Sequence, residues 1–238
     1  MRRMILGALA AAAASMVSLE AASAQPAAPS KQSSNAAAID RAWDAIEAKD
    51  PATAIALVEP VIAAEDAAHR GDPRQFYSAG SMAESLAYAA IGAKSGKDTV
   101  VVGPEWGKAN FIKGFALIDL GKSDQARKFL ERAVELSPFN AQFLGELGEW
   151  HKARREWPQA YDLFQRGEAV ASMMPSEDSQ KYFLRRALRG QGFVLIEQGR
   201  LDEAETLFKR CLEIDPEDDR AKSELNYIAD QRKKRTNS

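Results

Sequence analysis

The chain repeats one pattern: GKSDQARKFLERAVELSP at residues 121–138 returns as GRLDEAETLFKRCLEIDP at residues 199–216. Both segments carry small, large and small apolar side chains at positions i, i+4 and i+7, as in Ala204, Phe208 and Cys211. Residues with this spacing lie on one face of an α-helix. Small side chains let a neighbouring helix come close, and the large one fills the space beside it. The pattern therefore predicts helices that pack tightly against each other.

A third copy, at residues 155–172, lies between the first two and sets the period. Its Ala160 follows Ala126 by 34 residues and precedes Ala204 by 44, which is one period plus ten inserted residues. A glycine stands twelve residues before each alanine, at Gly114, Gly148 and Gly192. Glycine inside a helix costs about 1 kcal/mol relative to alanine. Its recurrence at this position therefore predicts a close approach of two helices in each unit.

The 34-residue period, with its first-helix glycine, second-helix alanine and large apolar residue, resembles the tetratricopeptide repeat (TPR). We assign three units, at residues 106–139, 140–173 and 185–218. The resemblance implies an all-α fold, a TPR-type right-handed superhelix of antiparallel helix pairs. Residues 219–238 are predicted to form a C-terminal capping helix and a basic tail, with Asp215-Pro216 at the start of the helix. The middle unit departs from the pattern at Ser172, where proline is expected.

The region at residues 36–105 is predicted to be helical and to contain a degenerate TPR-like unit. Residues 42–66 fit a helical hairpin that is broken at Asp50-Pro51, where Asp50 caps the second helix and Pro51 opens it. Residues 74–94 fit a further amphipathic helix. The Gly/Pro-containing stretch that follows is too short for a partner helix. The sequence leaves open how this last helix is paired.

The N-terminus has the features of a secretory signal peptide. Two arginines precede an apolar stretch at residues 5–19, and the small residues Ala22, Ser23 and Ala24 follow it. This predicts a signal peptide at residues 1–24 with cleavage before Gln25. The alternative, a permanent anchor, needs about 20 apolar residues. The alanine-rich leader resembles bacterial ones, so the expected location is the periplasm or the medium.

Composition excludes several classes of protein. The 238 residues include 32 Lys+Arg and 34 Asp+Glu, so the strongly basic surface of a nucleic-acid binder is missing. A single cysteine, Cys211, rules out an internal disulfide and a cysteine zinc cluster. Residues 25–35 hold no bulky apolar side chain and are predicted to be a flexible linker. No nucleic acid and no stable membrane insertion is expected, and the oligomeric state stays open.

Motifs for catalysis are missing. The segment GAKSGKDT at residues 92–99 differs from a phosphate-binding loop in glycine spacing, and Asp98 stands where Ser or Thr should follow the lysine. HExxH, GxSxG and CxxC do not occur in the sequence. His151 and Cys211 fall at positions expected to be packed. The sequence therefore predicts a protein that is not an enzyme and has no cofactor or metal.

The TPR resemblance implies a concave face formed by the first helix of each unit. Aromatic side chains flanked by basic groups would suit a peptide with apolar and acidic residues. Packing of the phenylalanines against neighbouring helices is an equally good interpretation. Phe115, Glu149 and Phe193 stand where a carboxylate-clamp TPR would need lysine and asparagine. The predicted groove residues are Lys108, Phe111, Phe115, Ile118, Asp119, Gln142, Glu149, Lys152, Arg186, Arg189, Phe193, Ile196 and Glu197.

These features together predict a non-catalytic periplasmic TPR adaptor or scaffold. Its concave groove would bind another envelope protein or a peptide segment, in the assembly or maintenance of the cell envelope. The alternative is an accessory subunit of an exopolysaccharide or cell-wall enzyme complex that contacts glycan.

Overall fold

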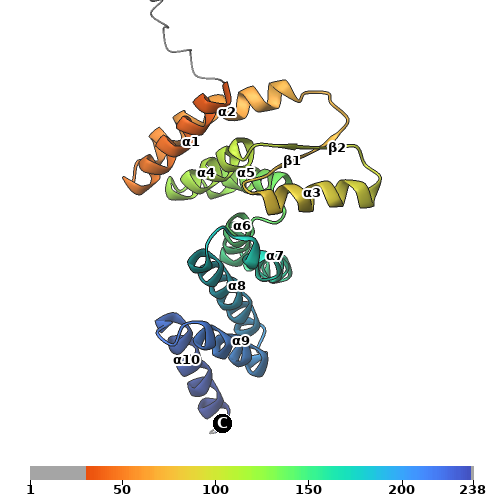
Figure 1. Ribbon diagram of the computed structural model, residues 1–238. Coiled ribbons are helices and arrows are strands. Elements are labelled where there is room, and N and C mark those ends of the chain that lie inside the picture. Colours follow the sequence, from red (N-terminus) through yellow and green to blue (C-terminus); the bar gives the residue numbers. More distant parts are fainter. Residues whose placement is uncertain (1–30, 237–238) are drawn as a thin grey trace, which may run out of the picture.

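The computed structural model describes residues 31–236, and side chains from 34 to 234. The predicted signal peptide and residues 25–30 of the predicted linker lie outside this range. Helices account for most of the described chain, so the predicted all-α class is confirmed, with one small sheet in addition (Figure 1). The elements are α1 (Lys31–Glu47), α2 (Pro51–Ala68), β1 (Gln75–Ser78), α3 (Met82–Ser95), β2 (Thr99–Val102), α4 (Glu105–Asp119), α5 (Ser123–Leu136), α6 (Ala141–Ala153), α7 (Trp157–Val170), a 3-10 turn (Ala171–Met173), α8 (Glu177–Glu197), α9 (Leu201–Ile214) and α10 (Asp219–Thr236).

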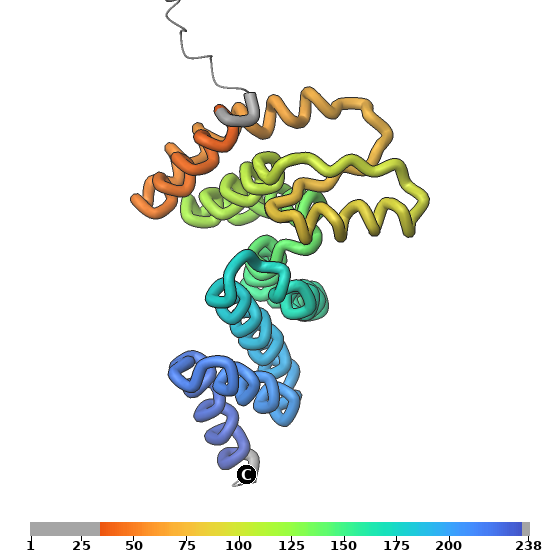
Figure 2. Tube along the Cα trace, viewed as in Figure 1, coloured from red at the N-terminus to blue at the C-terminus, as the bar shows by residue number. Residues whose placement is uncertain are grey.

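Four helix pairs stack one after another: α1/α2, α4/α5, α6/α7 and α8/α9. The second helix of each pair packs against the first helix of the next, so that α2 contacts α4, α5 contacts α6 and α7 contacts α8. Figure 2 shows the stack running from α1 to α10, which covers the end of the last pair. The predicted superhelix of antiparallel helix pairs is confirmed.

The repeated small and large residues hold each pair together. The alanines Ala126, Ala160 and Ala204 are fully buried. A Cβ atom on Gly148 would lie 2.8 Å from the ring of Phe164, and one on Gly192 would lie 2.6 Å from the ring of Phe208. Real Cβ atoms do not approach other atoms so closely, so glycine is required where the two helices of a pair cross.

The first pair, α1/α2, is the degenerate unit expected in residues 36–105. Asp50 caps α2 by accepting a hydrogen bond from the Thr53 amide at 3.1 Å, and Pro51 is the first helical residue, as predicted. Helix α1 already begins at Lys31, so the prediction of a flexible linker is wrong for residues 31–35.

Between the first two pairs, the chain forms a β-α-β unit. The prediction of a helix from residue 74 is wrong for residues 75–78, which form β1 and pair in parallel with β2, from Gln75 opposite Thr99 to Ser78 opposite Val102. The helix α3 starts only after Ser81, whose hydroxyl accepts from the Glu84 amide at 3.1 Å. This unit projects sideways from the stack (Figure 1). It explains why one helix of the N-terminal region has no partner helix.

The ten inserted residues lengthen α8, which starts at Glu177, about two turns before residue 185. A capping box of Ser176 and Ser179 fixes this new start.

At the junction between α9 and α10, the capping residue of α10 is not Asp215 as predicted. Asp218 accepts from the Ala221 amide at 3.1 Å, because Pro216 lies in the turn that joins α9 to α10. The capping helix itself is confirmed.

Candidate functional site

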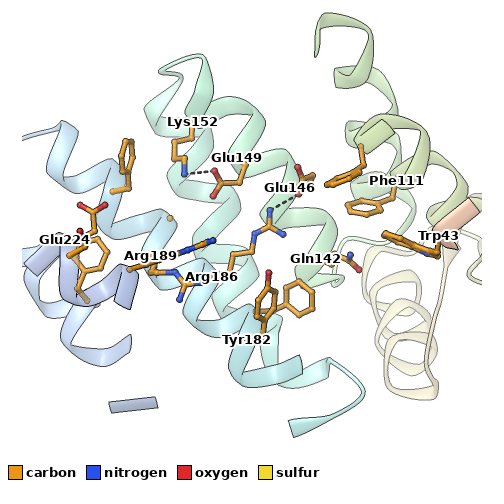
Figure 3. A pocket seen from close by; sticks show the side chains of 17 residues that line it. Trp43, Phe111, Gln142, Glu146, Glu149, Lys152, Tyr182, Arg186, Arg189 and Glu224 are labelled. Atoms are coloured by element: carbon orange, nitrogen blue, oxygen red, sulfur yellow. Dashed lines mark hydrogen bonds and ion pairs between the residues drawn. The ribbon is translucent and has the colours of Figure 1, made fainter. Parts of the chain in front are cut away.

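A cavity of about 620 Å³ lies on the side of the stack formed by the first helices. Its walls come from α1, α4, α6, α8 and α10, with one residue from α9 (Figure 3). This volume is in the range of ligand pockets. The cavity is the concave groove that the repeat pattern predicts.

Eight predicted groove residues lie around this cavity: Phe111, Phe115, Gln142, Glu149, Lys152, Arg186, Arg189 and Phe193. The other five do not line it. Ile118 and Ile196 pack against hydrophobic clusters between helices. Asp119 and Glu197 are exposed at the last residues of α4 and α8, and Lys108 lies near Glu84 instead. The prediction of a site at these five positions is not supported, because none of these side chains lines the cavity.

The α1–α4 end of the groove is aromatic and partly covered. The ring of Phe111 lies 4.6 Å from that of Phe143 and 5.9 Å from that of Trp43, which belongs to α1. Phe111 is therefore a core residue with only 1% of its surface exposed. Phe115 lies 6.3 Å from Phe111 and is half-buried. The N-terminal helix α1 thus closes this end of the groove without filling its centre.

Basic side chains in the middle of the groove are paired with acidic ones. Arg186 donates to the Glu146 carboxylate at 2.8 Å, and Lys152 lies 2.5 Å from Glu149 (Figure 3). The Lys152 ammonium also lies 4.9 Å from the centre of the Phe193 ring. The groove is therefore close to electrically neutral here. Its net charge gives little preference for an acidic ligand.

The remaining predicted cation, Arg189, holds the end of the groove together. It forms an ion pair with Asp218, and Arg185 donates to the same carboxylate at 3.1 Å. Burial alone would raise the pKa of Asp218. The Ala221 amide and the two arginines outweigh burial, so its pKa lies below the usual value. Arg189 is therefore a structural residue that fixes α10 against α8.

Sequence reasoning missed nine residues that line the groove: Trp43, Glu146, Tyr182, Phe183, Gly190, Phe208, Arg220, Ser223 and Glu224. Tyr182 and Phe183 lie in the part of α8 that the insertion adds, and half of the Tyr182 surface is exposed. The i, i+3, i+4 spacing of Arg220, Ser223 and Glu224 on α10 was the available signal for these three. Burial raises the pKa of Glu224, and the charge of Lys152 opposes this change.

Residues that could suggest chemistry have structural roles. His151 is buried with its Nδ1 atom 2.5 Å from the Glu156 carboxylate, across the turn from α6 to α7. Cys211 is fully buried, and burial raises its pKa to about 11, which makes the thiol unreactive. Within residues 31–236, no three His, Cys, Asp or Glu side chains are grouped to hold a metal.

No helix in the described part of the chain has both the length and the apolar character needed to cross a bilayer.

Comparison with known proteins identifies the repeats. The sequence profile of the tetratricopeptide repeat matches residues 107–140 and 185–218, which correspond to the first and third predicted units. No curated protein is significantly similar in sequence.

Among solved structures, PilF of Pseudomonas aeruginosa is similar over 85% of this chain and 71% of its own, with a TM-score of 0.57 at 11% identity. MamA of AMB-1 is similar over 83% of this chain and 81% of its own, with a TM-score of 0.52 at 17% identity. At such identities the likeness concerns the fold. The matched repeats and the stacked pairs together show that this chain carries tetratricopeptide repeats, which are units of helical scaffolds for protein–protein interaction.

Proposed function

We propose that the protein is a non-catalytic adaptor of the bacterial periplasm that binds a segment of another cell-envelope protein in its concave groove. The observation that carries this proposal is the open cavity along α4, α6, α8 and α10, with the half-exposed Tyr182 at its rim. Exposed aromatic side chains beside a concave surface are typical anchors for a partner. The N-terminal sequence pattern supports export.

The groove favours an amphipathic segment. One end offers Trp43, Phe115 and Phe183 for apolar side chains. The middle of the groove alternates acidic and basic groups, which hydrogen-bond to polar side chains or to the main chain of a peptide. Because Lys152, Arg186 and Arg189 are already paired, apolar contacts supply most of the affinity and the charged groups fix the register.

Site-specific photocrosslinking in the native cells tests this proposal. A photoreactive amino acid replaces Tyr182 in one strain and Tyr227 in another. Tyr227 is a matched control because it is also about half exposed, on α10, but does not line the groove. We expect a discrete protein adduct from position 182 alone, identified by mass spectrometry as an envelope protein. Equal labelling from both positions would contradict a binding groove.

The same experiment separates the parts of the proposal. A specific adduct with a cytoplasmic protein would retain the groove and reject the location. Capture of glycan in place of protein would favour the alternative, an accessory subunit of an exopolysaccharide or cell-wall enzyme complex.

A further inference from the structure

The β-α-β unit has a sheet edge that the rest of the described chain leaves open. The amides of Gln75 and Ala79 donate to the carbonyls of Asp98 and Val102. In a parallel pair, successive residues of a strand direct their main-chain groups alternately toward the partner strand and away from it, so Val100 also faces β1. Thr99 and Val101 then direct their amides and carbonyls away from β1. No hydrogen bond to these four groups is found within residues 31–236.

The other edge of the same sheet is covered. On β1, the Ser78 carbonyl accepts from the Ser137 hydroxyl at 2.6 Å, and the Phe76 carbonyl accepts from the Gln75 side chain at 3.3 Å. Natural proteins protect open edges with lysine, proline or bulges. The edge strand β2, Thr-Val-Val-Val, is short, with four residues, but it contains no lysine, proline or bulge. An open edge of such high β-propensity is suited to pairing with another strand.

A second unpartnered surface lies beside this edge. The side chains of Met82 and Leu86 on α3 are 75% and 65% exposed, and Ala89 and Ala93 continue the same apolar stripe. Each residue of a helix lies about 100° from the one before. Counted from the buried Tyr88, Ala89 is turned by about 100° and Leu86 by about 160°, so the stripe covers one flank of α3 and its outer side.

The flank of the stripe that carries Ala89 faces the side of β2. Crossovers between parallel strands are right-handed, which places the flank of α3 that carries Ala89 over β2 and away from β1. The contacts agree. Gly92 is the buried residue nearest this flank, and it lies against Thr99 of β2. A Cβ atom on Gly92 would be 2.6 Å from the Thr99 Cβ. The open edge and the apolar stripe thus form one continuous surface.

We propose that this surface is the dimer interface of the protein, with β2 pairing in antiparallel fashion with β2 of a second copy. In the register that places Val100 opposite Val100 of the partner subunit, Thr99 faces Val101 of the partner subunit. All four open main-chain groups of each copy are then used. The result is a continuous four-stranded sheet in which β2 is no longer an edge.

The same operation covers the stripe on α3. Strands are about 4.8 Å apart, so the two α3 helices lie two strand spacings, about 10 Å, from each other on one face of the sheet. Helices pack at about 8–10 Å. Gly92 lies over Thr99, and α3 runs antiparallel to β2. The part of α3 over Val100 is therefore about two residues before Gly92, and the symmetry axis passes near Ala89 and Ala90. Ala89 then lies against Ala89 of the partner subunit.

Charges at the two ends of β2 favour a second copy as the occupant. The exposed Lys97 precedes the strand and Glu105 follows it. Antiparallel pairing brings Lys97 of each copy toward Glu105 of the partner subunit, and this complementarity occurs twice.

Sedimentation equilibrium of the purified protein over a wide range of concentration tests the dimer. We expect a dimer that Ala89→Lys converts to a monomer with an unchanged circular dichroism spectrum. Ala89 is exposed, so the substitution leaves the subunit folded. The matched control Tyr227→Lys, on α10, should leave the dimer intact. A monomer at all concentrations, or a dimer that Ala89→Lys does not weaken, would overturn the proposal.

Cysteine crosslinking tests the arrangement independently. Ala89→Cys places a thiol near the symmetry axis and should give a disulfide-linked dimer on mild oxidation. Lys94→Cys, on the opposite flank of α3, should not. The native Cys211 is buried and contributes no background. Equal crosslinking of the two variants, or none with Ala89→Cys, would count against this interface.

Discussion

At the scale of single residues, the repeats depend on a few contacts that leave no space for an added atom. The backbone of Gly148 lies against the Phe164 ring, whereas Gly167, on the facing helix, has its nearest neighbours 3.8 Å from the place of a Cβ atom. Both glycines are buried in helices. They differ only in how much space is left.

This difference predicts opposite effects of one substitution. Gly148→Ala should lower the free energy of unfolding by about 1–3 kcal/mol, because overpacking outweighs the better helix propensity of alanine. Gly167→Ala should be neutral or stabilising by up to about 1 kcal/mol. Urea denaturation measures both. Similar losses from the two variants would mean that the crossing is not the cause.

Asp218 joins two helices through one carboxylate. Asp218→Ala removes the cap of α10 and leaves Arg189 without its partner, so we expect a loss of about 3 kcal/mol in the free energy of unfolding. The neighbouring Asp219→Ala is the control, because that side chain is 94% exposed. Thermal and urea unfolding of both variants give the comparison. An equal, small effect would argue against the ion pairs.

The pKa of Asp218 also predicts a dependence on pH. Its pKa is lower in the folded protein than in the unfolded chain. The group therefore stabilises the fold above the unfolded value of about 3.9, and this contribution is lost as the pH falls through the folded pKa. The difference in stability between the wild type and Asp218→Ala should shrink below about pH 4. A difference that persists at low pH would exclude this cause.

At the scale of elements, α10 is the cover of the stack. Ile228 is fully buried among residues of the α8/α9 pair, while its neighbour Tyr227 is half exposed. In a stack of repeats each unit contacts only its neighbours. Ile228→Ala should therefore increase hydrogen exchange in α9 and α10 and leave α1 to α5 unchanged, with Tyr227→Ala as the control. Faster exchange throughout the chain would show that stability is not local.

Elements that follow from local pattern were predictable, and elements that depend on distant partners were not. The small and large residues at Ala204 and Phe208 act within one helix pair, so their roles could be inferred from spacing. Residues 75–78 resemble the start of the helix that follows. They form a strand because β2, more than twenty residues later, pairs with them. The extension of α8 required knowing where the ten inserted residues go.

For the groove, sequence reasoning identified the helices but not the state of each side chain. Phe111 was open to two interpretations until Trp43 and Phe143 were seen against its ring. Arg186 and Arg189 looked available for an acidic ligand, and both are paired within the chain. Pairing across helices depends on the stacking geometry, which the spacing of residues in one helix does not contain.

At the scale of the whole molecule, the stack presents two separate surfaces: the groove along the first helices, and the edge formed by β2 and α3 (Figures 1 and 3). A dimer through β2 and α3 would leave both grooves free, because the β-α-β unit projects away from them. A dimer with two grooves gains avidity for a partner that carries two binding segments.

The measurement that tests the groove most directly is hydroxyl-radical footprinting of the protein with and without its captured partner. Oxidation of Tyr182, Phe183 and Phe115 should fall when the partner binds, while oxidation of Tyr227 and Leu120 stays the same. Unchanged oxidation at the three groove residues in a saturated complex would contradict binding in the concave groove.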